Sequence, residues 1–412
     1  MRPILAISLL LFTLFRASAQ RVFVPGDPIR KGADIVDIPF EYSNGFILID
    51  LVFDRHFPLR FLFDTGAENT ILTKKEITDI LGIPYQRTFP IIGADMRTEL
   101  TAHLATGIHL RIGVMELPLQ PILVLDEDFF QFEEFTGKNI HGILGANIFR
   151  NSVVKINYQR RVISLINPRF FHGPPAGFTE IDLEIKKNKP YLFVQTDIAD
   201  IRASGVKLLL DTGAGLSMIL NTNTHPNLQL PDNVVTGNIG AGLGGYLQGT
   251  LGRVDQLQFA DQLLLRDVPV NFQEITTDMD TSFLNNRNGI LGNEILRRFT
   301  VIIDYPHQKL YLKPNRYYFQ KFELDKSGLV IVVGGSRLNE YIVHSVLPGS
   351  PAEEAGILPG DQIRRINGWG AGFLGLDGIN NKLRKKTGKH IRLVLIRHDE
   401  KIKRQFRLRK LL

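Results

Sequence analysis

Two copies of one pattern lie 147 residues apart in this 412-residue sequence. The pattern consists of an apolar run that ends in Asp-Thr-Gly-Ala, then an Ile-Gly-Ala tripeptide, then a Gly-Ile-Leu-Gly tetrapeptide. The three pairs are 61–67 with 208–214, 92–94 with 239–241, and 142–145 with 289–292. Because one offset relates all three pairs without a gap, the sequence predicts two copies of one folding unit rather than chance matches.

Each copy is predicted to be rich in β-strands. Short apolar runs, continuous or alternating with polar residues, lie between Gly, Pro and Asn residues. The runs are 46–52, 59–63, 108–112, 153–156 and 162–166 in the first copy, and 191–196, 206–210, 263–265, 300–303 and 310–312 in the second. Short helices are expected at 74–81 and after each Gly-Ile-Leu-Gly. Segment 167–177, rich in Pro and Gly, is predicted to link the two lobes.

Asp64 and Asp211 each follow an apolar run, where a lone carboxylate is costly to bury. Two carboxylates about 3 Å apart share one proton, because they do not both ionise readily. The ionised partner then takes a proton from a water molecule between them, and the protonated partner polarises a scissile carbonyl. This chemistry predicts Asp64 and Asp211 as a catalytic pair that needs neither a metal ion nor a cofactor.

The residues after each aspartate are predicted to support the pair. Gly66 and Gly213 allow a tight turn and let backbone N–H groups approach the carboxylates. The hydroxyl groups of Thr65 and Thr212 are expected to tie the two loops together by hydrogen bonds.

The duplication, both Asp-Thr-Gly-Ala motifs and the later Ile-Leu-Gly triplets resemble pepsin-like and especially retropepsin-like aspartic proteases. The resemblance covers residues 30–315 and implies two β-barrel lobes, with each Ile-Leu-Gly crossing its Asp loop. It also implies β-hairpin flaps over the cleft. The flap candidates stand at matching positions in the two copies: Gly93, Ala94 and Asp95, and Gly240, Ala241 and Gly242.

Ala67 and Ala214 depart from the pepsin pattern, which often has a hydroxyl residue there. A hydroxyl donor favours the ionised carboxylate, so its absence is expected to leave the pKa values of the pair higher. We therefore expect activity to extend toward weakly acidic or neutral pH.

Other site types are disfavoured by their context. The run 240–245 fits Gly-x-Gly-x-x-Gly, but a strand-like segment follows it instead of the helix that a dinucleotide site needs. The ten histidines are scattered and form no His-Glu-x-x-His motif. No Gly-x-Ser-x-Gly nucleophile motif is present. The chain also lacks cysteine, which excludes disulfides and a thiol nucleophile.

In the last part of the chain, the segment from Ser345 to Gly368 resembles the signature of PDZ domains of the bacterial, protease-associated type. The resemblance covers 322–412 and implies a β domain with two short helices, expected after Ser350 and at 378–386. It also implies that an extended peptide, often a C-terminus, adds a strand to the sheet. The predicted peptide-binding residues are Gly328, Leu329, Val330 and Ile331. The alternative is that this unit only docks on the rest of the chain.

The net charge of +7 belongs to the C-terminal part. From Glu323 onward the sequence has 17 Lys and Arg against 9 Asp and Glu, so the preceding part is close to neutral. The basic stretch 401–410 alternates with apolar residues, which is typical of a strand with one solvated face. No nucleic-acid partner is predicted; an anionic envelope or another polyanionic partner is the alternative interpretation.

Residues 1–19 are predicted to be a secretory signal peptide, with Arg2, a short apolar run and Ala17-Ser-Ala19 before the cleavage point. An uncleaved anchor is the alternative, although the run is shorter than the ~20 residues of a membrane span. The predicted domains are lobe 1 at 20–168, lobe 2 at 176–318 and the PDZ domain at 322–412. The mature protein is expected outside the cytoplasm, without a transmembrane span.

The sequence thus predicts an extracytoplasmic aspartic endopeptidase that hydrolyses peptide or protein substrates through water held between Asp64 and Asp211. Because both aspartates lie in one chain, it is expected to act as a monomer. The PDZ domain is predicted to bind a substrate or partner peptide. The alternative function is a non-catalytic peptide-binding or scaffold protein with a degenerate cleft.

Overall fold

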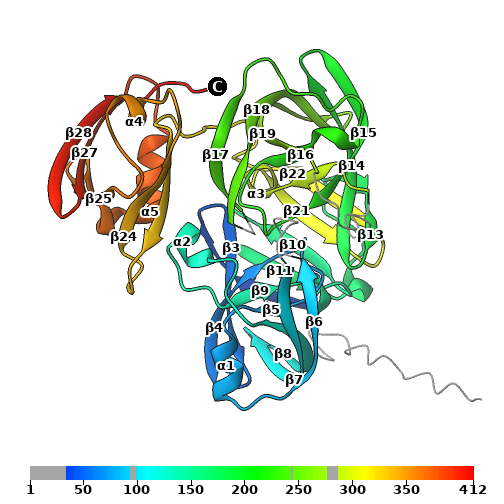
Figure 1. The fold of residues 1–412 in the computed structure, drawn as a ribbon. Coiled ribbons are helices and arrows are strands. Elements are labelled where there is room, and N and C mark those ends of the chain that lie inside the picture. Colours follow the sequence, from blue (N-terminus) through cyan, green and yellow to red (C-terminus); the bar gives the residue numbers. More distant parts are fainter. Residues whose placement is uncertain (1–33, 93–98, 243–244, 276–285) are drawn as a thin grey trace, which may run out of the picture.

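The structure is a computed structural model that describes residues 34–92, 99–242, 245–275 and 286–412. Two β lobes lie against each other, and a C-terminal domain lies beside them (Figure 1). The mainly β fold class predicted from the sequence is confirmed. Within the described ranges, no helix has the length and apolar character needed to cross a bilayer.

The two lobes are built from eight-stranded sheets with the same strand order. In lobe 1 the order is β2 (Glu41–Ser43), β3 (Phe46–Phe53), β4 (Phe57–Phe63), β9 (Gly142–Leu144), β5 (Ile71–Leu72), β8 (Met115–Leu125), β7 (Glu99–Ile112) and β6 (Tyr85–Ile92). In lobe 2 it is β13 (Glu184–Lys186), β14 (Lys189–Ile198), β15 (Ile201–Leu210), β20 (Gly289–Leu291), β16 (Met218–Asn221), β19 (Leu263–Gln273), β18 (Gly245–Ala260) and β17 (Val235–Gly242). Strand for strand, the sequence repeat is therefore a repeat of topology.

A third sheet, of six strands, joins the lobes. Its order is β1 (Ile35–Pro39), β11 (Val162–Ile166), β10 (Val153–Asn157), β21 (Phe299–Asp304), β22 (Lys309–Pro314) and β12 (Thr179–Asp182). At its centre β10 pairs antiparallel with β21, and Lys155 faces Ile302. Lys155 and Ile302 are equivalent in the 147-residue repeat, so the two-fold relation between the lobes passes through this pair. One continuous hydrophobic core extends through both lobes as a result.

The connector between the lobes packs on this central sheet. It contains the short helix η2 (Pro168–Phe170). Phe171 and Phe178 contact a buried cluster on one face of the sheet, formed by Val153, Ile166, Ile302 and Tyr311. The sequence suggested a linker because Pro and Gly dominate the segment, but its aromatic side chains cover apolar surface that would otherwise face water.

The helices are few and short. They are α1 (Lys75–Ile80), α2 (Phe132–Thr136), η1 (Ala146–Ile148), η3 (Thr222–Thr224), α3 (Asn293–Leu296), α4 (Pro351–Glu354) and α5 (Ala371–Leu383). The helix expected at 378–386 begins earlier than predicted, at Ala371. The helix ends at Leu383, and Gly375, at φ 66°, kinks it between two helical parts.

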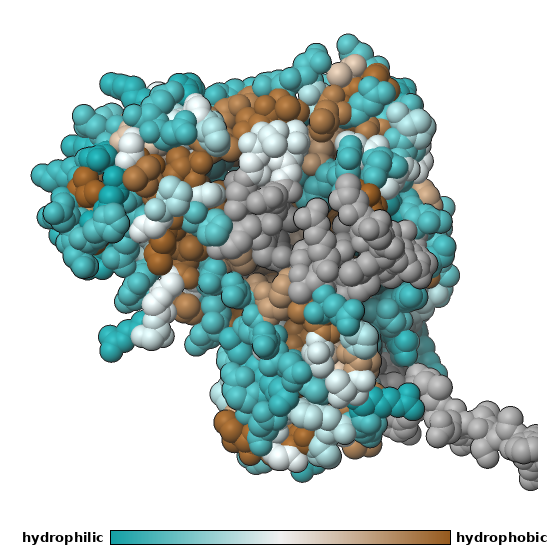
Figure 2. All heavy atoms as spheres, in the orientation of Figure 1, coloured by the Kyte–Doolittle hydropathy of each residue, from teal (hydrophilic) through white to brown (hydrophobic). Residues whose placement is uncertain are grey.

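The C-terminal domain has its own sheet and its own core. The sheet order is β23 (Leu329–Gly334), β24 (Glu340–Val346), β25 (Gln362–Ile366), β27 (His390–Arg397) and β28 (Glu400–Arg407), and β26 (Trp369–Gly370) pairs with β25. The Ser350 hydroxyl accepts a hydrogen bond from Glu353 N and caps α4, as the sequence predicted. On the face shown in Figure 2, hydrophobic side chains gather where this domain approaches lobe 2, whereas its outer side is mostly hydrophilic.

Four glycines let the strands of each lobe cross at close range. They are Gly142 and Gly145 in lobe 1, and Gly289 and Gly292 in lobe 2. A Cβ atom on Gly142 would lie 2.2 Å from the Ile71 carbonyl oxygen, and one on Gly289 would lie 1.9 Å from the Ile219 oxygen. No side chain fits there, because the neighbouring atom belongs to backbone that is itself fixed in the sheet.

We expect Gly289→Ala to lower the free energy of unfolding by about 3 kcal/mol or more, since the added methyl group displaces a buried strand. Thermal unfolding of the purified variant measures this. Gly372→Ala is the control, because a Cβ atom there meets no other atom within 4 Å. Equal unfolding temperatures for Gly289→Ala and the unmodified protein would contradict the proposed close approach.

Candidate active site

Asp64 and Asp211 stand at equivalent points of the two lobes. Each directly follows an apolar strand, β4 or β15, and each backbone N–H donates to the last residue of the crossing strand. Asp64 N bonds to Leu144 O at 3.1 Å, and Asp211 N bonds to Leu291 O at 3.0 Å. Both side chains are almost completely buried. The crossing strands therefore fix the backbone from which each carboxylate projects.

Thr65 and Thr212 tie the two aspartate loops together by reciprocal hydrogen bonds. Thr65 N donates to Thr212 Oγ1, and Thr212 N donates to Thr65 Oγ1, both at 3.0 Å. Each hydroxyl also donates across the interface, Thr65 to Leu210 O at 2.7 Å and Thr212 to Phe63 O at 2.9 Å. These four bonds are symmetric under the sequence repeat, and both side chains are fully buried.

The loops bring the two carboxyl groups into contact. The side chains of Asp64 and Asp211 are hydrogen-bonded to each other. Gly66 makes this approach possible, because a Cβ atom on it would lie 2.6 Å from the Asp211 carboxyl carbon. Backbone groups hold the carboxylates from the loop side: Gly66 N donates to Asp64 Oδ1 at 2.6 Å, and Gly213 N donates to Asp211 Oδ1 at 2.7 Å.

The electrostatic surroundings of the two carboxyl groups differ. Burial raises the pKa of Asp64 well above its usual range, and the charge and hydrogen bond of Asp211 raise it further. Burial also raises the pKa of Asp211, but the hydrogen bond from Asp64 and the one from Gly213 N oppose that rise, as do the charges of Arg287 and Lys189. Both pKa values are therefore raised by burial, and the two groups titrate as a pair that holds one proton between them.

This asymmetry comes from substitutions between the two copies. Lys189 of lobe 2 takes the position that Tyr42 has in lobe 1, and Arg287 takes the position of Ile140. The repeat thus supplies two matched carboxylates, and the second copy places two cations near one of them.

Asn293 is a buried residue of the site that sequence reasoning missed. Its side-chain amide donates to Thr212 O at 2.5 Å and to Gly45 O at 2.8 Å, and its oxygen accepts from the Tyr158 hydroxyl at 2.6 Å. It thereby holds the Asp211 loop against lobe 1. The sequence holds one indication of this role: Asn293 directly follows the second Gly-Ile-Leu-Gly, where the first copy has Ala146.

The two flap candidates are described to different extents. Gly93, Ala94 and Asp95 lie outside the described residues, at the end of the hairpin formed by β6 and β7. Gly240, Ala241 and Gly242 end strand β17, which pairs with β18 up to Gly242 opposite Gly245. A β-hairpin is thus present at the second position, between Asp211 and the second crossing strand.

The predicted peptide-binding residues lie on the edge strand of the C-terminal sheet. Leu329 and Ile331 of β23 are buried in the core of that domain, so their side chains face away from a ligand. Gly328 precedes the strand at φ 83°. An added peptide strand would therefore meet the backbone of β23, with α5 lying beside it.

Lobe 1 contacts both β23 and α5, the two elements that would form the sides of a peptide groove. On one side a Cβ atom on Gly137, just after α2, would lie 3.3 Å from Val333 of β23. On the other side Asp377 of α5 accepts hydrogen bonds from the Ser43 hydroxyl and Asn44 N, both at 2.9 Å. The Asn44 side chain joins the two contacts by donating to Thr136 O. In Figure 1, α2 accordingly lies between lobe 1 and the C-terminal domain.

In the described parts of the chain, no three carboxylate or imidazole side chains converge as a metal site would require. The chemistry available at the site is that of the two carboxyl groups, their backbone donors and the two nearby cations.

Family models match two parts of the chain. Residues 49–148 match the model for aspartyl proteases, and residues 342–397 match the model for PDZ domains. No curated protein matches the chain significantly. The predicted resemblance to retropepsin-like aspartic proteases with a C-terminal PDZ domain is confirmed. The first match includes Asp64 but not Asp211. Asp211 is assigned to the site because it is equivalent to Asp64 in the repeat and makes the symmetric contacts described above.

We expect Asp64→Asn to raise the thermal stability of the protein at pH 7. The raised pKa means that the folded state holds the Asp64 proton more tightly than the unfolded state does. Stability is therefore lost as pH rises from about 4, the usual pKa of an unfolded aspartate, through the raised pKa. Asparagine has no such titration and keeps the Gly66 and Ala67 hydrogen bonds.

Thermal unfolding of both proteins across pH measures this effect. The gain at pH 7 is expected to be a few degrees and to vanish near pH 4. Asp50→Asn, which removes an exposed carboxylate paired with Arg60 in the same lobe, is the control. A lower melting temperature for Asp64→Asn than for the unmodified protein at pH 7 would show that burial of Asp64 carries no ionisation cost.

Proposed function

We propose that this chain is an aspartic endopeptidase that hydrolyses peptide bonds with water activated between Asp64 and Asp211. The observation that carries the proposal is the reciprocal hydrogen bonding of Thr65 and Thr212, which brings two buried, hydrogen-bonded carboxyl groups to one point. The match of 49–148 to aspartyl proteases supports the same reaction class.

The proposed mechanism uses the one proton that the pair shares, which we place on Asp64 at the start. Ionised Asp211 accepts a proton from the water molecule, whose oxygen attacks the carbonyl carbon. Asp64 gives its proton to the carbonyl oxygen, so a neutral tetrahedral diol forms. When the diol collapses, Asp211 passes its proton to the leaving amine nitrogen and Asp64 takes one back from a hydroxyl group. The pair ends with the single shared proton with which it began.

The substrate is proposed to be an extended peptide lying beneath the hairpin of β17 and β18. Closing a hairpin over such a cleft excludes bulk water and strengthens the electrostatic action of the two carboxyl groups. We further propose that the protein acts as a monomer, because each lobe supplies one aspartate. Extracytoplasmic action, after removal of 1–19, remains a proposal from the sequence.

The alternative is a non-catalytic peptide-binding or scaffold protein. Its cleft would take extended peptides, and the PDZ domain would recruit partners. The aspartate pair argues against this alternative. Burying the charge of Asp64 and Asp211 lowers the stability of the fold, and a protein without a catalytic function would gain nothing from that loss.

We expect the mature chain to cleave an unfolded protein or a peptide library, and Asp64→Asn and Asp211→Asn to lose activity by about a thousand-fold or more. Each substitution removes one proton-transfer group of the pair. Product formation followed by mass spectrometry measures the rates. Asp50→Asn, at the same repeat unit but on the surface, is expected to retain full activity.

Two outcomes would decide against the proposal. Equal rates for both variants and the unmodified chain would exclude the dyad mechanism, and no cleavage by the unmodified chain would favour the scaffold. The same assay run across pH tests the expectation from Ala67 and Ala214. With the pKa of both carboxyl groups raised, the optimum is expected at weakly acidic or neutral pH rather than at strongly acidic pH.

The PDZ domain is proposed to bind C-terminal peptides at β23 in competition with lobe 1. We expect Asp377→Ala to raise the affinity of the full chain for such peptides by roughly ten-fold, because it removes two hydrogen bonds to a charged acceptor that hold the groove closed. Fluorescence anisotropy of peptides selected from a library measures the affinity.

Glu400→Ala removes another exposed carboxylate of the same domain, outside the contact with lobe 1, and is expected to leave the affinity unchanged. If no library peptide binds either the unmodified chain or Asp377→Ala, the PDZ domain only docks on the protease lobes.

A further inference from the structure

An exposed aromatic pair lies beside a cluster of lysines on the PDZ domain. Trp369 and Phe373 are 52% and 79% exposed, and their rings stack with centroids 5.6 Å apart. Lys382 Nζ lies 5.7 Å from the centre of the Trp369 ring. A cavity of about 510 Å³ continues from Lys382 and is lined by Asn367, Lys385, Lys386 and Lys389. We call the two aromatic residues and these four lysines the aromatic–lysine patch.

The kink in α5 explains how the two parts of the patch meet. Trp369 and Phe373 belong to β26 and the start of α5, whereas Lys382 is near the end of that helix. Gly375, at φ 66°, interrupts the helix between them and redirects the chain. A residue with a side chain adopts this backbone conformation only under strain, so glycine is needed at this position for the kink.

The stretch of sequence that carries the patch contains little negative charge. Between Asp361 and Asp399 the sequence has nine Lys and Arg and a single acidic residue, Asp377. That carboxylate is engaged by Ser43 and Asn44 of lobe 1. Across the described chain, no carboxylate forms an ion pair with any of the four lysines of the patch. Their charge is therefore available to an external partner.

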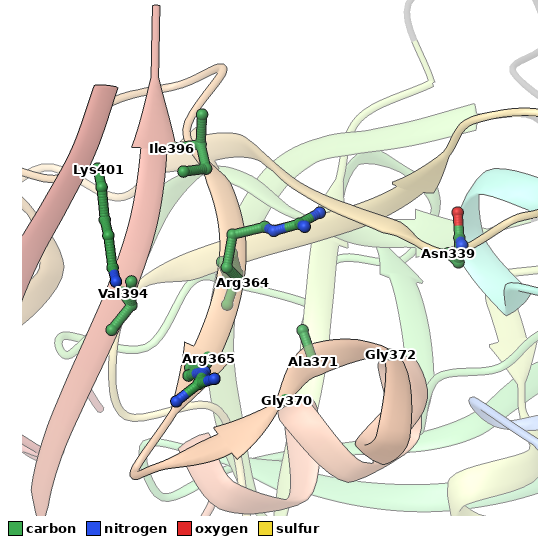
Figure 3. A pocket seen from close by; sticks show the side chains of 10 residues that line it. Asn339, Arg364, Arg365, Gly370, Ala371, Gly372, Val394, Ile396 and Lys401 are labelled. Carbon is green, nitrogen blue, oxygen red and sulfur yellow. The ribbon is translucent and has the colours of Figure 1, made fainter. Parts of the chain in front are cut away.

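A second cavity with basic residues in its lining lies at the start of α5. It has a volume of about 480 Å³, and its lining includes Arg364, Arg365 and Lys401 together with Gly370 to Gly372 at the start of α5. Figure 3 shows Gly370, Ala371 and Gly372 at the start of the helix and Arg364, Arg365 and Lys401 on nearby strands. The domain therefore carries positive charge beside the segment that contains the aromatic pair.

We propose that the aromatic–lysine patch docks this protein on an anionic lipid surface. Tryptophan and phenylalanine rings are favoured at the level of lipid headgroups, and lysines beside them are attracted to lipid phosphates. Exposed aromatic rings in a pair have no role in the folding of the domain, because neither belongs to its core. This inference does not depend on the proposed peptidase activity.

The chemistry of the patch favours lipid over an acidic protein. Recognition of a fixed carboxylate commonly uses the planar, bidentate guanidinium of arginine. All four cations of the patch are lysines, whose ammonium groups are point charges on flexible stems. Such groups suit a fluid array of phosphates, which offers no fixed geometry.

Trp369 is the only tryptophan in the chain, so its fluorescence reports directly on the patch. The mature full-length protein is mixed with vesicles of phosphatidylcholine containing phosphatidylglycerol, or with vesicles of phosphatidylcholine alone. We expect a blue shift of the emission and co-sedimentation with the anionic vesicles only, and we expect both to weaken as salt is added.

Two patch variants keep this probe. Lys385→Gln combined with Lys386→Gln is expected to lower the vesicle partition coefficient by roughly thirty-fold, since two attracted charges are lost. Phe373→Ser is expected to lower it by roughly ten-fold or more, since one buried ring is lost. Circular dichroism checks that each variant is folded, and the lysine variant alone suffices for the test because its side chains are on the surface.

The controls remove matched groups outside the patch. Phe319→Ser removes a ring that is 90% exposed, and Lys187→Gln combined with Lys321→Gln removes two exposed charges. Both are expected to bind vesicles like the unmodified protein. The proposal is overturned if anionic vesicles cause no shift, if both vesicle types bind equally, or if patch and control variants bind alike. A shift with polyglutamate but not with anionic vesicles would identify an acidic protein partner instead.

Discussion

The reciprocal hydrogen bonds between Thr65 and Thr212 are the contact on which the rest of the site depends. Each hydroxyl accepts from the opposite backbone N–H and donates to a carbonyl of the opposite strand, so four polar groups are satisfied in a dry interface. Loss of one hydroxyl would leave a buried N–H and a buried carbonyl without partners, at about 1–3 kcal/mol each. That penalty keeps the two lobes in one relative position. The central sheet, in which Lys155 pairs with Ile302, fixes the same arrangement through the backbone.

A symmetric scaffold carries an asymmetric pair of acids. The backbone around Asp64 and Asp211 follows the repeat closely, yet the second copy brings Lys189 and Arg287 near its carboxylate and places Asn293 behind its loop. Two carboxyl groups in contact share one proton even in identical environments, because their negative charges repel each other. Duplication therefore explains the geometry of the pair, and divergence between the copies gives the two carboxyl groups different charged neighbours.

The PDZ domain is attached to the lobes through contacts that also reach the Asp211 loop. Asp377 fixes the turn of Ser43 and Asn44, and the next residue, Gly45, accepts a hydrogen bond from Asn293, which holds Thr212. Strand β23 of the domain thus faces lobe 1, while the four lysines of the aromatic–lysine patch form no ion pair with a carboxylate of the described residues. The domain therefore has two surfaces of different chemistry. One contains β23 and Asp377 and contacts lobe 1, and the other is the aromatic–lysine patch, which we propose binds an anionic lipid surface.

The sequence by itself determined the duplication, the paired aspartates, the close glycines and the β character, because each leaves a local signal at one fixed offset. Thr65 and Thr212 were placed correctly for the same reason. Tertiary structure alone decided the central sheet, the packing of Phe171 and Phe178 on it, the role of Asn293, and the contact of lobe 1 with the PDZ groove. These features join residues more than a hundred positions apart or cover surfaces created only by folding, so no periodicity or short motif records them.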